Sequence, residues 1–160
     1  MAGKATPAVT TLTRAAVPHT LHEYDPAGAA EVGYGADAAS KLGIDPARVF
    51  KTLLASVDGA PVVGIVPVSG RLDLKALARA LGGSKAVMVD VADAERVTGY
   101  VAGGISPVGQ KRRLRTVLDS SALDHATIYV SGGRRGLDLE MDPADLVAIT
   151  EAITDRVGRD

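Results

Sequence analysis

Two glycine-rich segments, each followed by clustered cations, carry the most distinctive chemistry in the sequence. The first reads GGISPVGQKRRL at residues 103–114, and the second reads SGGRRG at residues 131–136. Backbone N–H groups of glycine-rich turns can approach an anion or a developing oxyanion closely, because no side chain intervenes. Two such segments in one small protein favour a shared cleft, although two independent solvated turns would have the same composition.

The first segment does not match a nucleotide-binding P-loop. Gly104 and Gly109 are separated by four residues, as in a P-loop, but Gln110 and Lys111 follow. A P-loop requires Lys and then Ser or Thr at these two positions, so the lysine is one place late and no hydroxyl could bind magnesium. The spacing therefore excludes an NTPase of this class.

Lys51 interrupts an apolar segment, VFKTLL, that predicts a strand. Such a lysine more often faces solvent, but inside a polar cavity it could bind a phosphate or stabilise negative charge. Asp138 and Glu140, in LDLEM, share one strand face and could orient a substrate amine. The alternative for this pair is the solvated face of a strand.

No protein nucleophile with an adjacent base stands out. The chain has no cysteine, which excludes disulfides, thiolate zinc sites and a cysteine nucleophile, and GISPVG does not match the GxSxG elbow. His19 and His22 have HxxH spacing, but a strand would place them on opposite faces, so neither a metal nor a cofactor is expected. An enzyme of this kind would act by positioning, with substrate or water as the attacking group.

Length and composition indicate one domain with an aliphatic core. The chain has 160 residues, 46% of them hydrophobic but only 3% aromatic. Its net charge of −1 excludes a chain-wide basic field, so any contact with nucleic acid must be local. We find no signal peptide and no apolar run of membrane-spanning length, and therefore expect a cytoplasmic protein without a membrane partner.

The elements that must position these residues alternate without a regular βαβ rhythm. Helices are expected from Thr6 onward and over residues 29–43, 73–82, 92–99 and 142–158. Strands are expected over residues 19–25, from 49 to a hairpin turn at Asp58-Gly59, and over 61–70, 86–91, 115–120, 126–132 and 137–141. The pattern predicts a mixed α/β sheet or small barrel, formed by residues 6–160 after a flexible terminus at residues 1–5.

Four segments, TPAV, VFKTLL, GGISPVGQKRRL and IYVSGGRRGLD, follow one another from Thr6 almost to the last expected helix. With them the chain resembles the YbaK/EbsC family of aminoacyl-tRNA deacylases. The resemblance implies a barrel-like mixed β-sheet surrounded by helices. It also implies that the ester between cysteine and the 3′ end of mischarged Cys-tRNA(Pro) is cleaved in trans, by attack of the substrate's own thiol, which releases a thiolactone.

The same resemblance implies roles for individual residues. Catalytic roles fall on Lys51, Gly103 and Gly104, with Lys51 at the phosphate of the terminal adenosine or at the ester. Substrate-binding roles fall on Tyr24, Tyr34, Thr52, Ile105, Ser106, Pro107, Ser131, Gly132, Gly133 and Asp138. Contacts to tRNA fall on Lys111, Arg112, Arg113, Arg134 and Arg135. Tyr34 is a departure, because the family usually has phenylalanine there and AGAAEVGYGA contains an extra residue.

Two alternative functions stay open at this point. One is a deacylase for another small amino acid, such as alanine. The other is a non-catalytic module that binds tRNA or a synthetase, in which the cations from Lys111 to Arg115 would do most of the binding. In each case the expected partners are the acceptor end of tRNA(Pro) and prolyl-tRNA synthetase, in a ternary complex, and DNA is not expected to bind.

Overall fold

The computed structural model describes residues 5–160, so the flexible terminus expected at residues 1–5 lies outside the described residues except for Ala5. The fold is mixed α/β. Its largest sheet has the order β5-β2-β3-β6-β9, formed by Ala86–Met88, Phe50–Val57, Ala60–Pro67, Arg115–Asp119 and Ile153–Asp155. A second sheet has the order β1-β8-β7, formed by Thr20–Glu23, Leu137–Met141 and Ile128–Arg134, and a third pairs β10 (Gly158–Arg159) with β4 (Arg71–Leu72).

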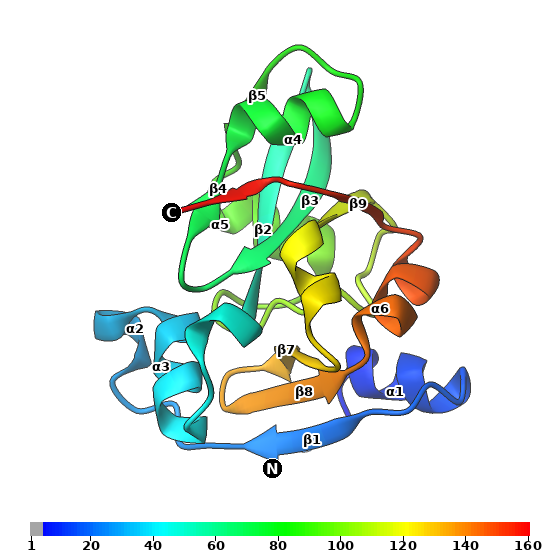
Figure 1. The fold of residues 1–160 in the computed structure, drawn as a ribbon. Coiled ribbons are helices and arrows are strands. Elements are labelled where there is room, and N and C mark those ends of the chain that lie inside the picture. Colours follow the sequence, from blue (N-terminus) through cyan, green and yellow to red (C-terminus); the bar gives the residue numbers. More distant parts are fainter. Residues whose placement is uncertain (1–4) are drawn as a thin grey trace.

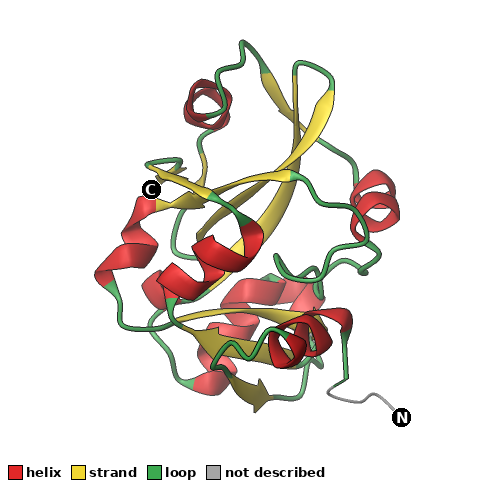
Figure 2. Ribbon diagram, turned by 90° about the vertical axis from the view of Figure 1, so that its right-hand side faces the viewer, coloured by secondary structure: helices red, strands yellow, loops and turns green. Residues whose placement is uncertain are grey.

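The large sheet is mixed, as expected. β6 runs parallel to β3 and to β9, whereas β2 pairs antiparallel with β3 and β5. In Figure 1 the β1-β8-β7 sheet lies below the long β2–β3 hairpin, and one parallel bridge between Val49 and Tyr129 connects the two sheets. The helices lie around the strands (Figure 2). Residues just after Val49 are therefore held close to both sheets.

The β2–β3 hairpin has the predicted turn. Asp58 and Gly59 both have positive φ, at 51° and 89°, as a two-residue type I′ turn requires. Residues 62–66 of β3 are all buried, which confirms the expectation of a strand covered on both faces. The hairpin thus forms the central scaffold of the large sheet.

Three of the six α-helices in residues 5–160, the first, the fourth and the last, begin at the positions expected from the sequence. The helices are α1 (Pro7–Arg14), α2 (Ala29–Val32), α3 (Tyr34–Leu42), α4 (Leu74–Ala80), α5 (Val91–Thr98) and α6 (Pro143–Thr150), with short 3-10 segments at Pro46–Arg48 and Ser120–Asp124. Thr6 and Asp73 cap α1 and α4 with their side-chain oxygens. The single helix expected over 29–43 is wrong: the chain breaks at Gly33, whose φ of 104° is incompatible with a helix, and α3 starts afresh at Tyr34.

The long C-terminal helix expected over residues 142–158 is also wrong. Helix α6 ends at Thr150, and Glu151 takes a left-handed conformation with φ 56°. The chain then forms β9, which pairs with β6, and β10. The Asp119 carboxylate accepts hydrogen bonds from the N–H groups of Val157 and Gly158 at 2.9 and 2.7 Å. These tertiary partners outweigh the local helix pattern.

Two apolar clusters pack on opposite faces of the β2–β3 hairpin. One contains Phe50, Leu54 and Ile65, together with Val130 and Leu139 of the small sheet. The other is formed by Ala55, Val57, Val62, Val66, Leu72, Ala76, Leu77, Ala78, Leu81, Val117 and Val157. None of the helices in residues 5–160 is long and apolar enough to cross a membrane. The two clusters hold β2 rigidly between them.

Candidate functional site

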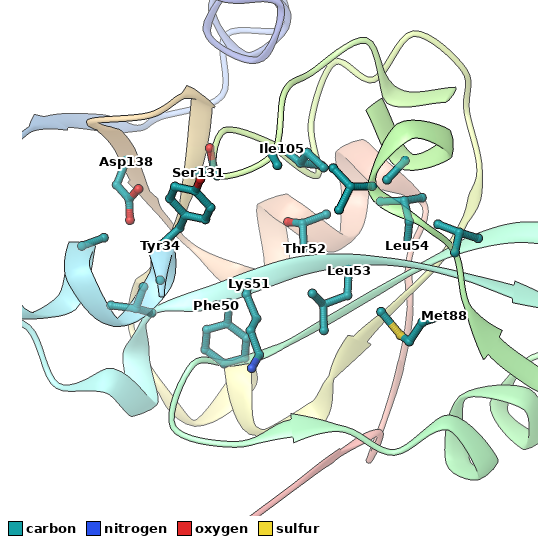
Figure 3. A pocket seen from close by; sticks show the side chains of 18 of the residues that line it. Tyr34, Phe50, Lys51, Thr52, Leu53, Leu54, Met88, Ile105, Ser131 and Asp138 are labelled. Carbon is teal, nitrogen blue, oxygen red and sulfur yellow. The ribbon is translucent and has the colours of Figure 1, made fainter. Parts of the chain in front are cut away.

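A cavity of about 320 Å³ opens beside β2. Its wall comes from α3, β2, the N-terminal part of α5, residues 102, 103 and 105, and one residue each of β7 and β8 (Figure 3). These segments are far apart in the sequence. Of the residues predicted for the site, the cavity brings together Tyr24, Tyr34, Lys51, Thr52, Gly103, Ile105, Ser131 and Asp138.

Lys51 lies half-buried on β2 without an ion-pair partner among the described residues. Burial lowers the pKa of its ammonium group from the usual value, because the charged form loses hydration. Lys51 and Thr52 leave the strand in opposite directions, and the Lys51 side chain points away from Ile105 (Figure 3). An unpaired cation at this position is suited to an incoming anion.

Asp138 is the most deeply buried acid of the cavity, with 5% of its surface exposed. Its carboxyl has no hydrogen-bond or ion-pair partner among residues 5–160, and burial raises its pKa to about 7. The pKa of Tyr24 is raised to about 12, by burial first and by the Asp138 charge second. A buried carboxyl without a partner is suited to a cationic group of a ligand.

Tyr34 and Gly103 form one wall of the cavity in close contact. Gly103 has φ +84°, and a Cβ atom there would lie 2.6 Å from the Tyr34 ring. The Arg135 guanidinium lies over the Tyr34 ring, 4.9 Å from the ring centroid, and its Nε donates to the Ala102 carbonyl at 2.7 Å. Glycine at 103 is therefore required by both conformation and space.

The two glycine-rich segments lie side by side, but most of their glycines serve packing. A Cβ atom on Gly104 would lie 2.7 Å from the Arg134 Cα, and the Gly104 N–H donates to the Val101 carbonyl at 2.8 Å. The Gly132 carbonyl accepts from Thr6 Oγ1 at 2.5 Å. Neither Gly104 nor Gly132 lines the cavity, and the same holds for Gly133. These three glycines therefore allow close packing, Gly104 against the Arg134 backbone and Gly132 and Gly133 against neighbouring side chains.

Ser106 and Pro107 also lie away from the cavity wall. Ser106 is fully buried, and its Oγ accepts from the Val108 N–H at 3.3 Å while its carbonyl accepts from Gln110 Nε2 at 3.0 Å. Pro107 lines a second, smaller cavity of about 150 Å³ between α1 and α6. These two residues hold the loop in shape, with help from Tyr100, whose hydroxyl donates to the Val108 carbonyl at 2.6 Å.

The predicted tRNA-contacting cations fall in two places. Lys111, Arg112 and Arg113 are exposed beside the second cavity, which shares no lining residue with the first. Arg113 forms an ion pair with Glu151. Arg134 and Arg135 lie near the first cavity, where Arg134 pairs with Glu23 at 3.2 Å and Arg135 covers Tyr34. Cations thus lie on two separate parts of the surface.

The predicted Asp138–Glu140 pair divides into two environments. Glu140 accepts hydrogen bonds from Thr127 Oγ1 at 2.5 Å and His22 Nε2 at 2.9 Å, and the Thr127 hydrogen bond is the main cause that lowers its pKa. Glu140 does not line the cavity, so Asp138 alone of the pair can meet a ligand there. Among residues 5–160, no cluster of three His, Asp or Glu side chains could hold a metal ion.

Sequence reasoning missed the apolar half of the cavity. This half is formed by Leu53, Leu54, Met88, Val89, Val91 and Ala94. Met88 and Val91 are 48% and 60% exposed, which is high for large apolar side chains. The AVMVDV pattern predicts a strand through Val91, but the strand ends at Met88 and Asp90 caps α5. Nothing in the local pattern indicates that these residues face a ligand.

Comparisons with known proteins identify relatives of this chain. Residues 31–149 match the family model described as the aminoacyl-tRNA editing domain. EbsC of Enterococcus faecalis, provisionally named a Cys-tRNA(Pro)/Cys-tRNA(Cys) deacylase, is 41% identical over 113 residues, which are 70% of this chain and 69% of EbsC. The proline–tRNA ligase of Maridesulfovibrio salexigens is 31% identical over 122 residues, 69% of this chain but only 21% of the ligase.

The fold has a close counterpart among solved structures. A crystal structure described as that of a candidate trans-editing enzyme for prolyl-tRNA synthetase superposes with a TM-score of 0.85 at 23% identity, over 100% of this chain and 99% of the other. At 23% identity this similarity shows a common fold only. The family of the chain is shown by the sequence matches. The chain belongs to the aminoacyl-tRNA editing domain family.

Proposed function

We propose that the protein is a trans-acting editing enzyme that removes cysteine from mischarged Cys-tRNA(Pro). The observation that carries this proposal is one cavity holding an unpaired half-buried ammonium, Lys51, and an unpaired buried carboxyl, Asp138, with no cysteine and no histidine among the described residues that line it. The activity for which EbsC is named supports the choice of substrate.

The charges of the cavity suit the groups around an aminoacyl ester. An aminoacyl-tRNA carries a cationic α-ammonium close to the ester and an anionic phosphate one nucleotide unit away. We assign the α-ammonium to the Asp138 carboxylate and the phosphate of the terminal adenosine to Lys51. Tyr34 and Gly103 then form the wall beside the acyl group. Residues 6–160 act in this scheme as a single editing domain.

The cleavage step needs no nucleophile from the protein. The cysteine sulfur attacks its own carbonyl carbon, an S–C bond forms, and the bond from that carbon to the ribose oxygen breaks. The thiol proton passes to the departing ribose oxygen, so a thiolactone and uncharged tRNA result. The cavity contributes orientation and electrostatic stabilisation, which suffice when attacking and attacked atoms belong to one molecule.

Selectivity for the tRNA comes from a partner in this proposal. The chain matches only a segment of proline–tRNA ligase, so the editing domain also occurs built into an enzyme that recognises tRNA(Pro). We infer that this chain meets tRNA(Pro) on prolyl-tRNA synthetase in the cytoplasm, as a ternary complex. Lys111 and Arg112 add a local contact to the single-stranded acceptor end of the tRNA. A pull-down that recovers no synthetase with tRNA(Pro) present would contradict the complex.

A panel of esters tests the reaction. Wild-type protein is incubated with tRNA(Pro) carrying cysteine, serine, alanine or proline, and remaining ester is measured over time. We expect fast loss of cysteine and little loss of serine, because a hydroxyl is a far weaker internal nucleophile than a thiol. Comparable rates for cysteine and serine would indicate an activated water. Fast loss of alanine would identify the other deacylase, and survival of every ester with retained tRNA binding would identify a binding module.

A further inference from the structure

Thr52 carries a buried hydroxyl without a partner. Its Oγ1 is shielded from solvent and makes no hydrogen bond in the structure. Only one other buried side-chain atom of residues 5–160 lacks a hydrogen bond, Asp37 Oδ2, and that atom has the Lys41 ammonium 3.0 Å away. Buried hydroxyls normally find a partner, because an unmade hydrogen bond destabilises the folded state. Thr52 therefore needs an explanation.

Other buried threonines of the chain satisfy their hydroxyls on backbone carbonyls. Thr98 Oγ1 donates to the Ala94 carbonyl at 2.7 Å, and Thr116 Oγ1 donates to the Leu114 carbonyl at 3.0 Å. Thr52 lies in the middle of β2, where its own backbone pairs with β3 opposite Ile65. Valine would fit the same strand position with the same shape and without an unmet polar atom.

Thr52 itself lies at the cavity and is only partly buried. Thr52 lines the cavity together with Gly103 and Ser131, and its side chain points from β2 toward Ile105 (Figure 3). Ile105 and Leu54, which leaves the strand on the same side, offer no polar atom from their side chains. A ligand group that lies between Thr52 and Ile105 would meet apolar side chains and the Thr52 hydroxyl.

We propose that the Thr52 hydroxyl holds the sulfur of the cysteine side chain and thereby selects cysteine over alanine; this rests on the proposed function above. A thiol is small, weakly polar, and can donate or accept one hydrogen bond. In the resting complex the S–H donates to Oγ1, and when the sulfur loses its proton the hydroxyl donates to the thiolate. The second contact is the stronger, because its acceptor is charged. An alanine methyl group would leave the hydroxyl unpaired.

The binding test uses two uncleavable analogues, 3′-amino-3′-deoxyadenosine linked by an amide to cysteine or to alanine. Dissociation constants are measured by calorimetry under reducing conditions for wild type, Thr52→Val and Thr52→Ser. We expect Thr52→Val to weaken the cysteine analogue by about tenfold and to leave the alanine analogue unchanged. Thr52→Ser, which keeps the hydroxyl, should retain the preference. Equal weakening of both analogues would mean that the Thr52 hydroxyl contacts the ribose or the linkage instead of the sulfur. Equal affinities in all variants would mean that the hydroxyl does not contribute to binding. Either result overturns the proposal.

The stability of the unliganded protein gives an independent readout. Thr52→Val removes an unmet hydroxyl and should leave the melting temperature unchanged or raise it. Thr98→Val, the matched control, removes a hydroxyl that is hydrogen-bonded and should lower it. A comparable fall for both variants would mean that Thr52 has a partner within the protein, which also overturns the proposal. Failure of wild type to cleave Cys-tRNA(Pro) would refute the proposed function alone, because neither readout depends on cleavage.

Discussion

Gly103→Ala should displace Tyr34 and thereby reduce the deacylation rate by a larger factor than its modest loss of stability explains. Gly103 has φ +84°, so any side chain there pays for a left-handed backbone, at about 1–2 kcal/mol. Its Cβ would also lie 2.6 Å from the Tyr34 ring, and the ring must retreat by about 1 Å to reach ordinary contact. Displacements of that size in a positioning site can cost on the order of 100-fold in rate.

Gly28→Ala separates these two effects. Gly28 has φ +79° and nothing within 4 Å of its missing Cβ, so alanine there meets the same backbone cost without a clash. Urea unfolding should show both variants destabilised by about 1–2 kcal/mol, with the larger loss in Gly103→Ala. Single-turnover deacylation of Cys-tRNA(Pro), measured where both variants are fully folded, should fall 10- to 100-fold for Gly103→Ala only. Equal rates in the two variants would refute the assignment of the Tyr34–Gly103 wall.

Three further changes probe other parts of the account. Burial raises the pKa of Asp138 to about 7, above its value of about 3.9 in the unfolded chain. The native state therefore binds more protons between these values, and the free energy of unfolding should fall as pH rises from about 4 to 7. Asp138→Asn should flatten this dependence in urea titrations across that range. Asp119→Ala removes the acceptor that fixes the C-terminal strands and should lower stability by about 3 kcal/mol in the same assay; an unchanged midpoint would contradict this role. Replacing Lys111 and Arg112 by glutamine should reduce the log–log salt slope of tRNA binding by about 0.7 per lost phosphate contact, whereas Lys75→Gln, exposed on α4, should not.

The sequence predicted those parts of the fold that depend on local chemistry. Thr6 and Asp73 cap helices because their side chains reach the first free N–H groups, and Asp58-Gly59 forms the hairpin turn because both accept positive φ. The break at Gly33 was not predicted, because the sequence does not show that this glycine takes a φ of 104°. The end of α6 at Thr150 was not predicted either, because tertiary contacts decide it. In particular, β9 exists because β6 offers it a partner.

The candidate site was predictable to a similar extent. Lys51, Gly103, Ser131 and Asp138 belong to distinctive motifs, and the fold brings them to one cavity. A motif gives no information about which of its glycines lines the cavity, so the packing roles of Gly104, Gly132 and Gly133 follow only from the three-dimensional arrangement. The apolar wall follows from the path of the chain between β5 and α5, which no local pattern fixes.

The central claim is that the Lys51 cavity cleaves the ester, and single-turnover deacylation of Cys-tRNA(Pro) by Lys51→Ala tests it most directly. Lys75→Ala, with its side chain exposed on α4, is the matched control for loss of one positive charge. We predict that Lys51→Ala loses at least tenfold in rate while it stays folded, and that Lys75→Ala cleaves at the wild-type rate. Equal rates for wild type and Lys51→Ala would contradict the account.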